Sequence, residues 1–212
     1  MLDLHSLNDA PYPLSGKISP SLFELQHLKY LDLNGNNFHD DITKLRNLSK
    51  LQYLNLGYNY DLKCENLVWL SHLSLLSHLD LSCVNLSKAV DWVQSINNLP
   101  LLQEVRLFAC ILPDITTHPS LPFNSSVSLF MLDLSYNDIS SSICGWLFNF
   151  SSSLVDVDLS SNQLKGLIPD SFGGMISLTN LCLSFNHLEG GLPKSFANVS
   201  HICVLLICLK TC

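Results

Sequence analysis

The amino-acid sequence predicts an α/β solenoid, in which short strands stack into a curved parallel β-sheet along the concave side. Two observations predict this fold. The segment LTNLCLSFNHLEGGLPKSF, at residues 178–196, is matched position for position by LVDVDLSSNQLKGLIPDSF at residues 154–172 and by LFMLDLSYNDIS at residues 129–140. The leucines and an asparagine keep fixed places in each copy, and a period of about two dozen residues indicates a repeat architecture.

The same frame fits four earlier segments: LKYLDLNGNNF from Leu28, LQYLNLGYNY from Leu51, LSHLDLSCVNL from Leu76 and LQEVRLFACIL from Leu102. We therefore expect seven repeats over about residues 28–199, preceded by a partial repeat at 1–27. A degenerate repeat follows at 200–212, where Ile202, Leu205 and Ile207 keep the phase. The predicted organisation is a single array over residues 1–212, without cysteine-paired caps, a transmembrane segment or a kinase domain.

Each repeat is expected to contribute one strand, because alternate residues of a strand face opposite sides of a sheet. In the run Leu181-Cys182-Leu183, the two leucines then point inward and the cysteine faces out. One such strand cannot bury its leucines alone, so neighbouring repeats must stack on it. The result is a continuous leucine core behind the sheet.

An asparagine follows the strand in five repeats, at Asn36, Asn59, Asn137, Asn162 and Asn186. Its amide is suited to satisfy buried backbone groups of adjacent turns. Cys110 and Val84 take this place in two other repeats. Because valine offers no polar group, we expect a looser turn at Val84.

A short convex helix is expected within residues 86–99, LSKAVDWVQSINNL, where Val90, Val93 and Ile96 have helical spacing. The same segment contains Trp92. We expect this indole to cover the convex core, with an exposed contact as the alternative.

The repeat endings LKGLIPDSF, LEGGLPKSF and LSGKISPSLF resemble the plant-specific subclass of leucine-rich repeats. The runs YPLSGKISPSLFELQHLKYLDL and NLSKAVDWVQSINNLP resemble plant receptor-like proteins, the group that includes receptors for fungal xylanase. The resemblance implies a leucine-rich repeat solenoid whose convex side, of the LxGxIP type, consists of turns, short strands and short helices. It also implies a segment of a plasma-membrane receptor, on the extracellular side, that binds a peptide or protein ligand in defence or developmental signalling. A receptor kinase is the implied co-receptor.

The sequence features that bear on the cellular compartment point in different directions. The start MLDLHSLNDAPYP lacks the basic and apolar regions of a secretory signal, and no run of about 20 apolar residues predicts a membrane span. Asn-x-Ser glycosylation acceptors nevertheless occur at Asn47, Asn85, Asn124, Asn149 and Asn198. Asn47, Asn149 and Asn198 each precede the first apolar residue of a repeat by four or five positions, so we expect them on one outer edge. Sugars there leave the concave face free.

Composition and motifs exclude several classes of function. The 18 acidic residues outnumber the 11 basic ones, and the net charge of −7 gives nucleic-acid phosphates no attraction. The sequence contains no nucleophile elbow, phosphate loop or kinase signature, so we expect neither an enzyme nor a cofactor. The eight cysteines do not have the spacing of a disulfide framework, which favours free thiols. No metal site is expected, since His201 and the cysteines of the tail lack paired ligand spacing.

Outward strand positions line up as columns across the concave surface. The first column is Tyr30, Tyr53, His78, Glu104, Met131, Asp156 and Asn180; the second is Asp32, Asn55, Asp80, Arg106, Asp133, Asp158 and Cys182; a third holds Tyr58, Tyr136 and Phe185. Because tyrosine and arginine carry much of the energy of interfaces, the candidate ligand-binding residues are Tyr30, Tyr53, Tyr58, His78, Glu104, Arg106, Phe108, Tyr136 and Phe185. The recurring aspartates are interpreted as solvated positions of the repeat.

Three alternatives to the receptor segment remain at this stage. A secreted protein resembling the polygalacturonase inhibitors would share the repeat subclass and need no anchor. A cytosolic repeat scaffold would leave the glycosylation acceptors unmodified and the thiols free. A truncated, non-functional copy would expose its leucine core at both ends and tend to aggregate.

Overall fold

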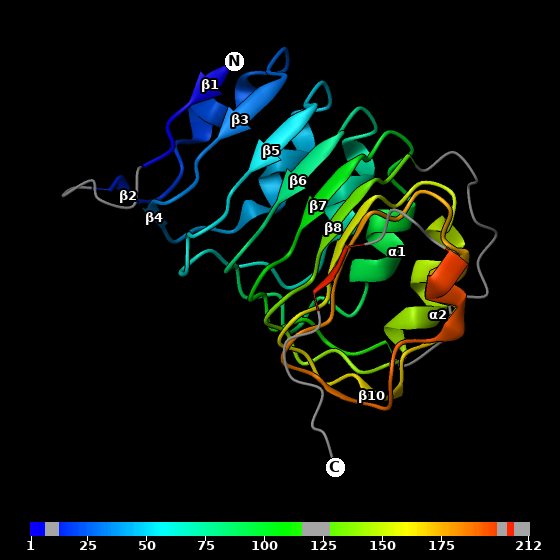
Figure 1. Ribbon diagram of the computed structural model, residues 1–212. Coiled ribbons are helices and arrows are strands. Elements are labelled where there is room, and N and C mark those ends of the chain that lie inside the picture. The colour runs from blue at the N-terminus through cyan, green and yellow to red at the C-terminus, as the bar shows by residue number, and fades with distance from the viewer. Residues whose placement is uncertain (7–12, 116–127, 199–202, 206–212) are drawn as a thin grey trace.

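The predicted strands form, and within the described part of the chain nine strands stack into one parallel sheet. The computed structural model describes residues 1–6, 13–115, 128–198 and 203–205. In order across the sheet the strands are β1 (Leu2–Asp3), β3 (Tyr30–Asp32), β5 (Tyr53–Asn55), β6 (His78–Asp80), β7 (Glu104–Arg106), β8 (Met131–Asp133), β9 (Asp156–Asp158), β11 (Asn180–Cys182) and β13 (Cys203–Leu205). Figure 1 shows them as a curved row, with helices on the opposite side of the solenoid.

The strand register confirms the predicted columns. Tyr30 pairs with Tyr53, Tyr53 with His78 and His78 with Glu104. The same register continues through β8, β9 and β11. At β13 the phase expected from Leu205 is wrong by one residue, since Val204 pairs with the inward Leu181 and Leu205 pairs with Cys182.

The inward leucines form one continuous hydrophobic core along the solenoid. Leu181 and Leu183 are buried whereas Cys182 between them is half-buried, as the alternation predicts. Many leucines of the central repeats are entirely inaccessible, among them Leu54, Leu79 and Leu107. The strands of the sheet are only two or three residues long, so the core depends on contact between neighbouring repeats.

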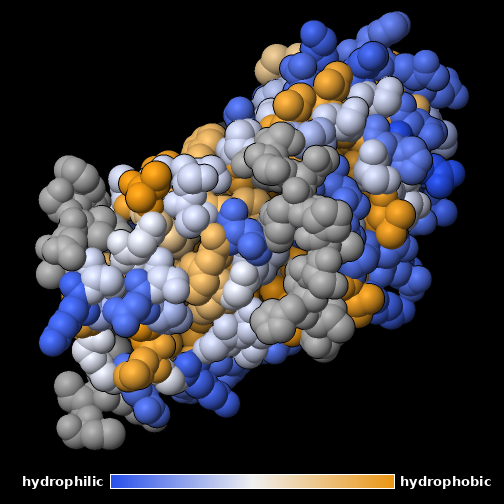
Figure 2. Space-filling view, turned by 90° about the vertical axis from the view of Figure 1, so that its right-hand side faces the viewer, coloured by the Kyte–Doolittle hydropathy of each residue, from blue (hydrophilic) through white to orange (hydrophobic). Residues whose placement is uncertain are grey.

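Short helices line the side opposite the sheet. They are η1 (Pro20–Glu24), η2 (Ile42–Asn47), η3 (Val68–His72), α1 (Trp92–Asn97), α2 (Ile143–Leu147), η4 (Phe148–Phe150), η5 (Asp170–Gly174) and η6 (Lys194–Asn198), where η denotes a 3₁₀ helix. Figure 2 views the molecule from the side of α1 and α2, and its apolar residues lie in separate patches between hydrophilic ones.

Two additional strand pairs run beside the main sheet, where the repeat endings of the plant-specific type lie. β2 (Ser15–Gly16) pairs with β4 (Asn37–Phe38), and β10 (Lys165–Leu167) pairs with β12 (His187–Glu189). The LxG stretches LSG and LKG contribute β2 and β10. These pairs match the predicted convex side of short strands and turns.

The helix expected within residues 86–99 is α1. Trp92 begins it and is buried, and its indole N–H donates to the carbonyl of Pro113 at 3.0 Å. The expectation that this indole covers the convex core is therefore confirmed. Val90 shares the helical spacing but is not part of the helix, since it precedes α1 and is 82% exposed.

The asparagine ladder forms as predicted. The Asn59 amide nitrogen donates to the carbonyls of Leu33 (2.8 Å) and Leu56 (3.0 Å), while its oxygen accepts from the Phe38 N–H (3.2 Å). Asn36, Asn137, Asn162 and Asn186 make corresponding bonds. Each amide thus joins two turns whose backbone groups would otherwise be buried without partners.

The two repeats without asparagine solve this problem differently. The Cys110 thiol donates to the Leu81 carbonyl at 3.1 Å and so replaces part of the amide's role. The turn at Val84 is closed by its own N–H, which donates to the Leu81 carbonyl at 2.9 Å, and the valine is fully buried. The prediction of a looser turn at Val84 is therefore wrong, because this turn keeps its backbone hydrogen bond.

Candidate ligand-binding face

Three rings of the first column stack on the concave face. The Tyr30 and Tyr53 centroids lie 4.2 Å apart with an interplanar angle of 12°, and those of Tyr53 and His78 lie 4.1 Å apart at 6°. Parallel strands in register place equivalent side chains about 4.8 Å apart, which suits offset stacking. Tyr30, Tyr53 and His78 therefore form a flat wall, called here the stacked wall. Burial raises the pKa of the Tyr53 hydroxyl, which stays protonated at neutral pH.

A charged group ends the stacked wall. His78 Nδ1 lies 2.9 Å from a Glu104 carboxylate oxygen, and the same oxygen is 3.9 Å from the Arg106 guanidinium. Arg106 Nε is buried without a hydrogen-bond partner among the described residues. The structure thus brings His78, Glu104 and Arg106 together, as the columns predict, and leaves one donor of the arginine unused.

The recurring aspartates of the strands accept hydrogen bonds from the backbone of the turns that follow. Asp32 accepts from the Asn34 N–H at 2.9 Å, and Asp80 accepts from the Ser82 N–H at 2.8 Å. The interpretation of these two as solvated positions is wrong, because they are only 6% and 7% exposed. Each holds the backbone two residues on, where the strand ends. Arg106 occupies this position in its repeat and cannot accept such a bond.

Each repeat turns away from the sheet through one residue in the left-handed conformation. Gly35 (φ 70°) takes this place in the first complete repeat, and Tyr58 (φ 57°), Tyr136 (φ 55°) and Phe185 (φ 54°) take it in three others. The Tyr58 N–H donates to the Ser82 carbonyl at 2.7 Å, which fixes the turn against the next repeat. Bulky residues are genuine outliers in this region.

These left-handed aromatics project from the edge of the concave face. Tyr58, Tyr136 and Phe185 are 37%, 58% and 60% exposed. The Phe108 ring lies between the first two, with its centroid 6.4 Å from Tyr58 and 5.1 Å from Tyr136. Tyr58, Phe108, Tyr136 and Phe185 are called here the aromatic rim. Backbone strain under exposed rings favours a functional reason for keeping them.

Replacing Phe185 with glycine is expected to raise the free energy of unfolding by about 1 kcal/mol, because glycine enters the left-handed region without steric cost. Phe185→Ala is the matched control, since it removes the ring but keeps the Cβ atom and the strain. Urea denaturation of both variants measures the difference. A glycine variant no more stable than the alanine variant contradicts the strain.

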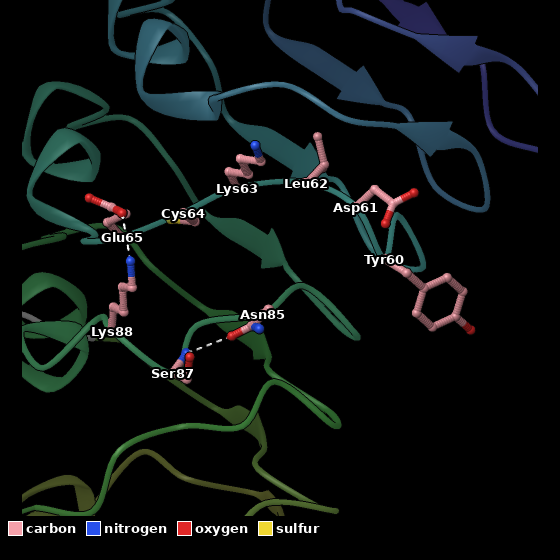
Figure 3. A pocket seen from close by; sticks show the side chains of 9 residues that line it. All are labelled: Tyr60, Asp61, Leu62, Lys63, Cys64, Glu65, Asn85, Ser87 and Lys88. Atoms are coloured by element: carbon pink, nitrogen blue, oxygen red, sulfur yellow. Dashed lines mark hydrogen bonds and ion pairs between the residues drawn. The ribbon is translucent and has the colours of Figure 1, made fainter.

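A pocket of about 440 Å³ lies on the solenoid's flank (Figure 3), and none of the candidate ligand-binding residues lines it. It is lined by Tyr60, Asp61, Leu62, Lys63, Cys64, Glu65, Asn85, Ser87 and Lys88. The ion pair between Glu65 and Lys88 (2.8 Å) spans it, although both side chains are more than 70% exposed and the pair stabilises little. Sequence reasoning missed this pocket; its one signal is the neighbouring Val84, which replaces a ladder asparagine.

The glycosylation acceptors whose side chains the structure describes lie at the surface. Asn47 ends η2, Asn149 lies in η4 and Asn198 ends η6, so all three fall in equivalent convex helices. Asn47, Asn85 and Asn149 are exposed. The Asn149 amide also donates to the carbonyls of Gly145 (3.2 Å) and Trp146 (3.0 Å). Asn124 lies outside the described residues.

The cysteines that the structure describes with side chains are free thiols: Cys64, Cys83, Cys110, Cys144 and Cys182. This confirms the expectation for these five. Burial raises the pKa of Cys64 and of Cys144 to about 11, so neither is a thiolate at neutral pH.

Sequence reasoning also missed one side-chain cluster, at the N-terminal end of the sheet. Ligand atoms of Asp3, His5 and Asp32 lie within 4.8 Å of one another. His5 Nδ1 is 2.6 Å from an Asp3 oxygen, and this hydrogen bond raises the pKa of His5 and lowers that of Asp3. No regular spacing marks these residues in the sequence.

Comparison with known proteins gives consistent matches. The family profile Leucine rich repeat matches residues 128–188, and a second, Leucine Rich Repeat, matches residues 27–48. Receptor-like protein EIX1 of Solanum lycopersicum is 39% identical over 191 residues, covering 78% of this chain and 18% of the relative. Receptor-like protein EIX2 of the same plant is 39% identical over 210 residues, covering 84% and 21%. The chain thus spans about a fifth of the length of these relatives.

Solved structures show the same architecture. The ectodomain of the Arabidopsis receptor kinase HAESA, in complex with an extended IDA peptide hormone, superposes with a TM-score of 0.73 at 28% identity, covering 93% of this chain and 32% of that one. HAESA with IDA and the co-receptor SERK1 gives 0.69 at 29%, covering 92% and 33%. Across residues 1–6, 13–115, 128–198 and 203–205, no helix is long and apolar enough to cross a membrane. The sheet, the ladder and these matches place the chain among the plant leucine-rich repeat receptor-like proteins.

Proposed function

We propose that this chain forms part of the ligand-binding surface of a plant cell-surface receptor, and that its concave face contacts a peptide or protein ligand. The observation that carries the proposal is the aromatic rim, in which Tyr58, Tyr136 and Phe185 are exposed on a strained backbone. Small residues take this position in the other repeats, as Gly35, Cys83, Ala109 and Ser161 do, so stacking alone does not require an aromatic side chain there. Proteins of this repeat family are binding modules, and we propose no catalytic activity.

The stacked wall and the aromatic rim have different tasks in this proposal. The rim offers exposed ring faces at the edge, which suit apolar or proline-bearing side chains of a ligand. The wall offers a flat floor that ends in Glu104 and Arg106, and the guanidinium of Arg106, whose side chain is 43% exposed, can bind a ligand carbonyl or carboxylate. The wall, the two charged residues at its end and the rim together contain the nine candidate ligand-binding residues.

The complexes of related receptors support a peptide ligand and a second receptor. HAESA binds its hormone together with SERK1, so we propose a receptor kinase as co-receptor of the parent protein. We also propose that the parent protein resides in the plasma membrane with these repeats outside the cell, in defence or developmental signalling. The EIX relatives favour this reading over the inhibitor and the cytosolic scaffold.

Selection of peptides displayed on phage against the full chain tests the proposal. Binders are expected to lose at least about tenfold in affinity when Tyr58 and Tyr136 are replaced by alanine, because anchoring aromatics carry about 2 kcal/mol or more each. Val68→Ser with Val90→Ser is the matched control, since both valines are exposed outside the main sheet. Binders that respond only to the control pair overturn the proposal.

A further inference from the structure

The geometry points to an extended, cationic peptide segment, bearing lysine or arginine, as the occupant of the concave face. This inference rests on the proposed function and names the chemistry of its ligand. It is carried by the distribution of charge over the sheet, by the aspartates that lack ion pairs, and by the aromatic side chains beside them.

Most of the chain's negative charge faces the ligand side of the sheet. Outward positions of the strands β1 to β11 hold Asp3, Asp32, Asp80, Glu104, Asp133, Asp156 and Asp158. Arg106 is the one Lys or Arg at these positions, so seven acidic residues less one arginine leave a net charge of −6 on this face. The whole chain carries −7. The remaining surface is therefore close to neutral, and only this face attracts a cation over a distance.

Five of these carboxylates have no ion-pair partner among the described residues, and three of the five lie on two adjacent strands. Asp133 lies on β8, and Asp156 and Asp158 lie on the adjacent strand β9, with Asp133 paired to Asp158 in the register. The ion pairs of the concave face involve Asp3 and Glu104 instead. Burial, and to a smaller extent the charge of Asp158, raises the pKa of Asp133. A cation placed here offsets the cost of desolvation and reduces the repulsion.

The aromatic residues extend this preference. A lysine ammonium or arginine guanidinium over a tyrosine face gains a cation–π attraction, and Tyr136 lies beside the acidic strands with 58% of its surface exposed. Seven strands from β3 to β11 span about 29 Å at a spacing of about 4.8 Å, the length of about nine extended residues. A segment of that size reaches from the stacked wall to Asp158.

The test compares two synthetic nine-residue peptides, one with alternating lysine and tyrosine and one with glutamate for each lysine. The variant D133N/D156N/D158N removes three charges from the concave face. Its turns are kept, because asparagine accepts the same backbone bond that Asn55 accepts from the Gly57 N–H at 3.0 Å. The control variant E24Q/D170N/E189Q removes three charges from exposed positions outside the main sheet.

Calorimetry is expected to show the lysine peptide binding the chain at least about tenfold more tightly than the glutamate peptide, with affinity falling as salt rises. The concave variant should lose about tenfold in affinity for it, and the control less than about twofold. Equal binding of the two peptides overturns the inference. Equal loss in both variants also overturns it, because the attraction then follows net charge and not this face.

The phage selection separates this inference from the proposed function. Peptides that bind through the aromatic rim but are not enriched in lysine or arginine leave the proposed function standing and overturn the cationic ligand. Peptides that bind outside the concave face overturn both, whatever their charge.

Discussion

Replacing Trp146 with alanine is expected to lower the free energy of unfolding by about 4 kcal/mol, the usual loss for a buried tryptophan. Trp146 lies in α2 and is almost fully buried. Its ring makes edge contacts with Trp92 (centroids 5.5 Å apart) and Phe150 (5.1 Å), and its indole N–H donates to Asn97 at 2.9 Å. The substitution therefore opens a cavity and leaves the partner oxygen of Asn97 without its donor.

The position of Trp146 makes this loss affect the whole array. Its partner Trp92 belongs to a helix 54 positions earlier in the sequence, so the pair links convex segments that are two repeats apart. Stability in a solenoid comes from contacts between neighbouring repeats, and removing this link should weaken the coupling between the N-terminal and C-terminal halves. We expect the urea transition to shift to lower denaturant and to broaden.

Trp146→Phe is the control, since it keeps an aromatic ring in the core and removes the indole N–H. It should lose about 1–2 kcal/mol, from the hydrogen bond and the smaller ring. A loss below about 1 kcal/mol for Trp146→Ala would contradict the tight packing seen here, because the site would then collapse without a cavity.

Regular features of the fold were predictable from the sequence because they depend on short spacings. Alternation within a strand assigns Leu181 and Leu183 to the core, and the repeat period aligns Tyr30, Tyr53 and His78 in one column. The asparagine at a fixed distance after the strand then identifies the ladder. These inferences need only the geometry of a strand and the need to satisfy backbone groups.

Other features depend on contacts between repeats, which the spacing does not reveal. The left-handed conformation of Tyr58 is fixed by the bond from its N–H to Ser82 in the next repeat. Asp32 is buried because the neighbouring rows of side chains close over it, although its position faces outward. Val90 has helical spacing but precedes the helix, because α1 begins only at Trp92.

The ladder asparagine Asn137 gives the other large expected effect. Its amide nitrogen donates to the carbonyls of Leu107 (2.9 Å), Leu134 (2.9 Å) and Ser135 (3.1 Å). Its oxygen accepts from the N–H groups of Cys110 and Leu112, both at 3.1 Å. Asn137→Ala leaves both N–H groups without this partner, and we expect a loss of about 4 kcal/mol, since each unsatisfied buried group costs about 1–3 kcal/mol.

Val84 shows that a valine is tolerated at this place in the repeat, yet Asn137→Val is expected to cost nearly as much as Asn137→Ala. The two positions differ in the backbone N–H group that the asparagine oxygen would accept from. In the repeat before Val84, the residue equivalent to Leu112 is Asp61. Asp61 is exposed and borders the flank pocket, so water can satisfy its N–H. Leu112 is buried and has no such access.

Urea denaturation of Asn137→Val, Asn137→Ala and Asn137→Asp separates these contributions. The aspartate keeps an acceptor for Cys110 and Leu112 but turns a buried carboxylate oxygen toward the three carbonyls to which the amide nitrogen of Asn137 donates. At neutral pH it should therefore be the least stable of the three variants, and it should recover part of the loss at a pH low enough to protonate it, because the protonated acid can donate. If Asn137→Val is as stable as the unchanged chain, the N–H groups of Cys110 and Leu112 find other partners in the variant. The burial of Leu112 would then not be the reason that asparagine is present here, and Val84 would be an ordinary member of the ladder instead of the residue that accompanies an open pocket.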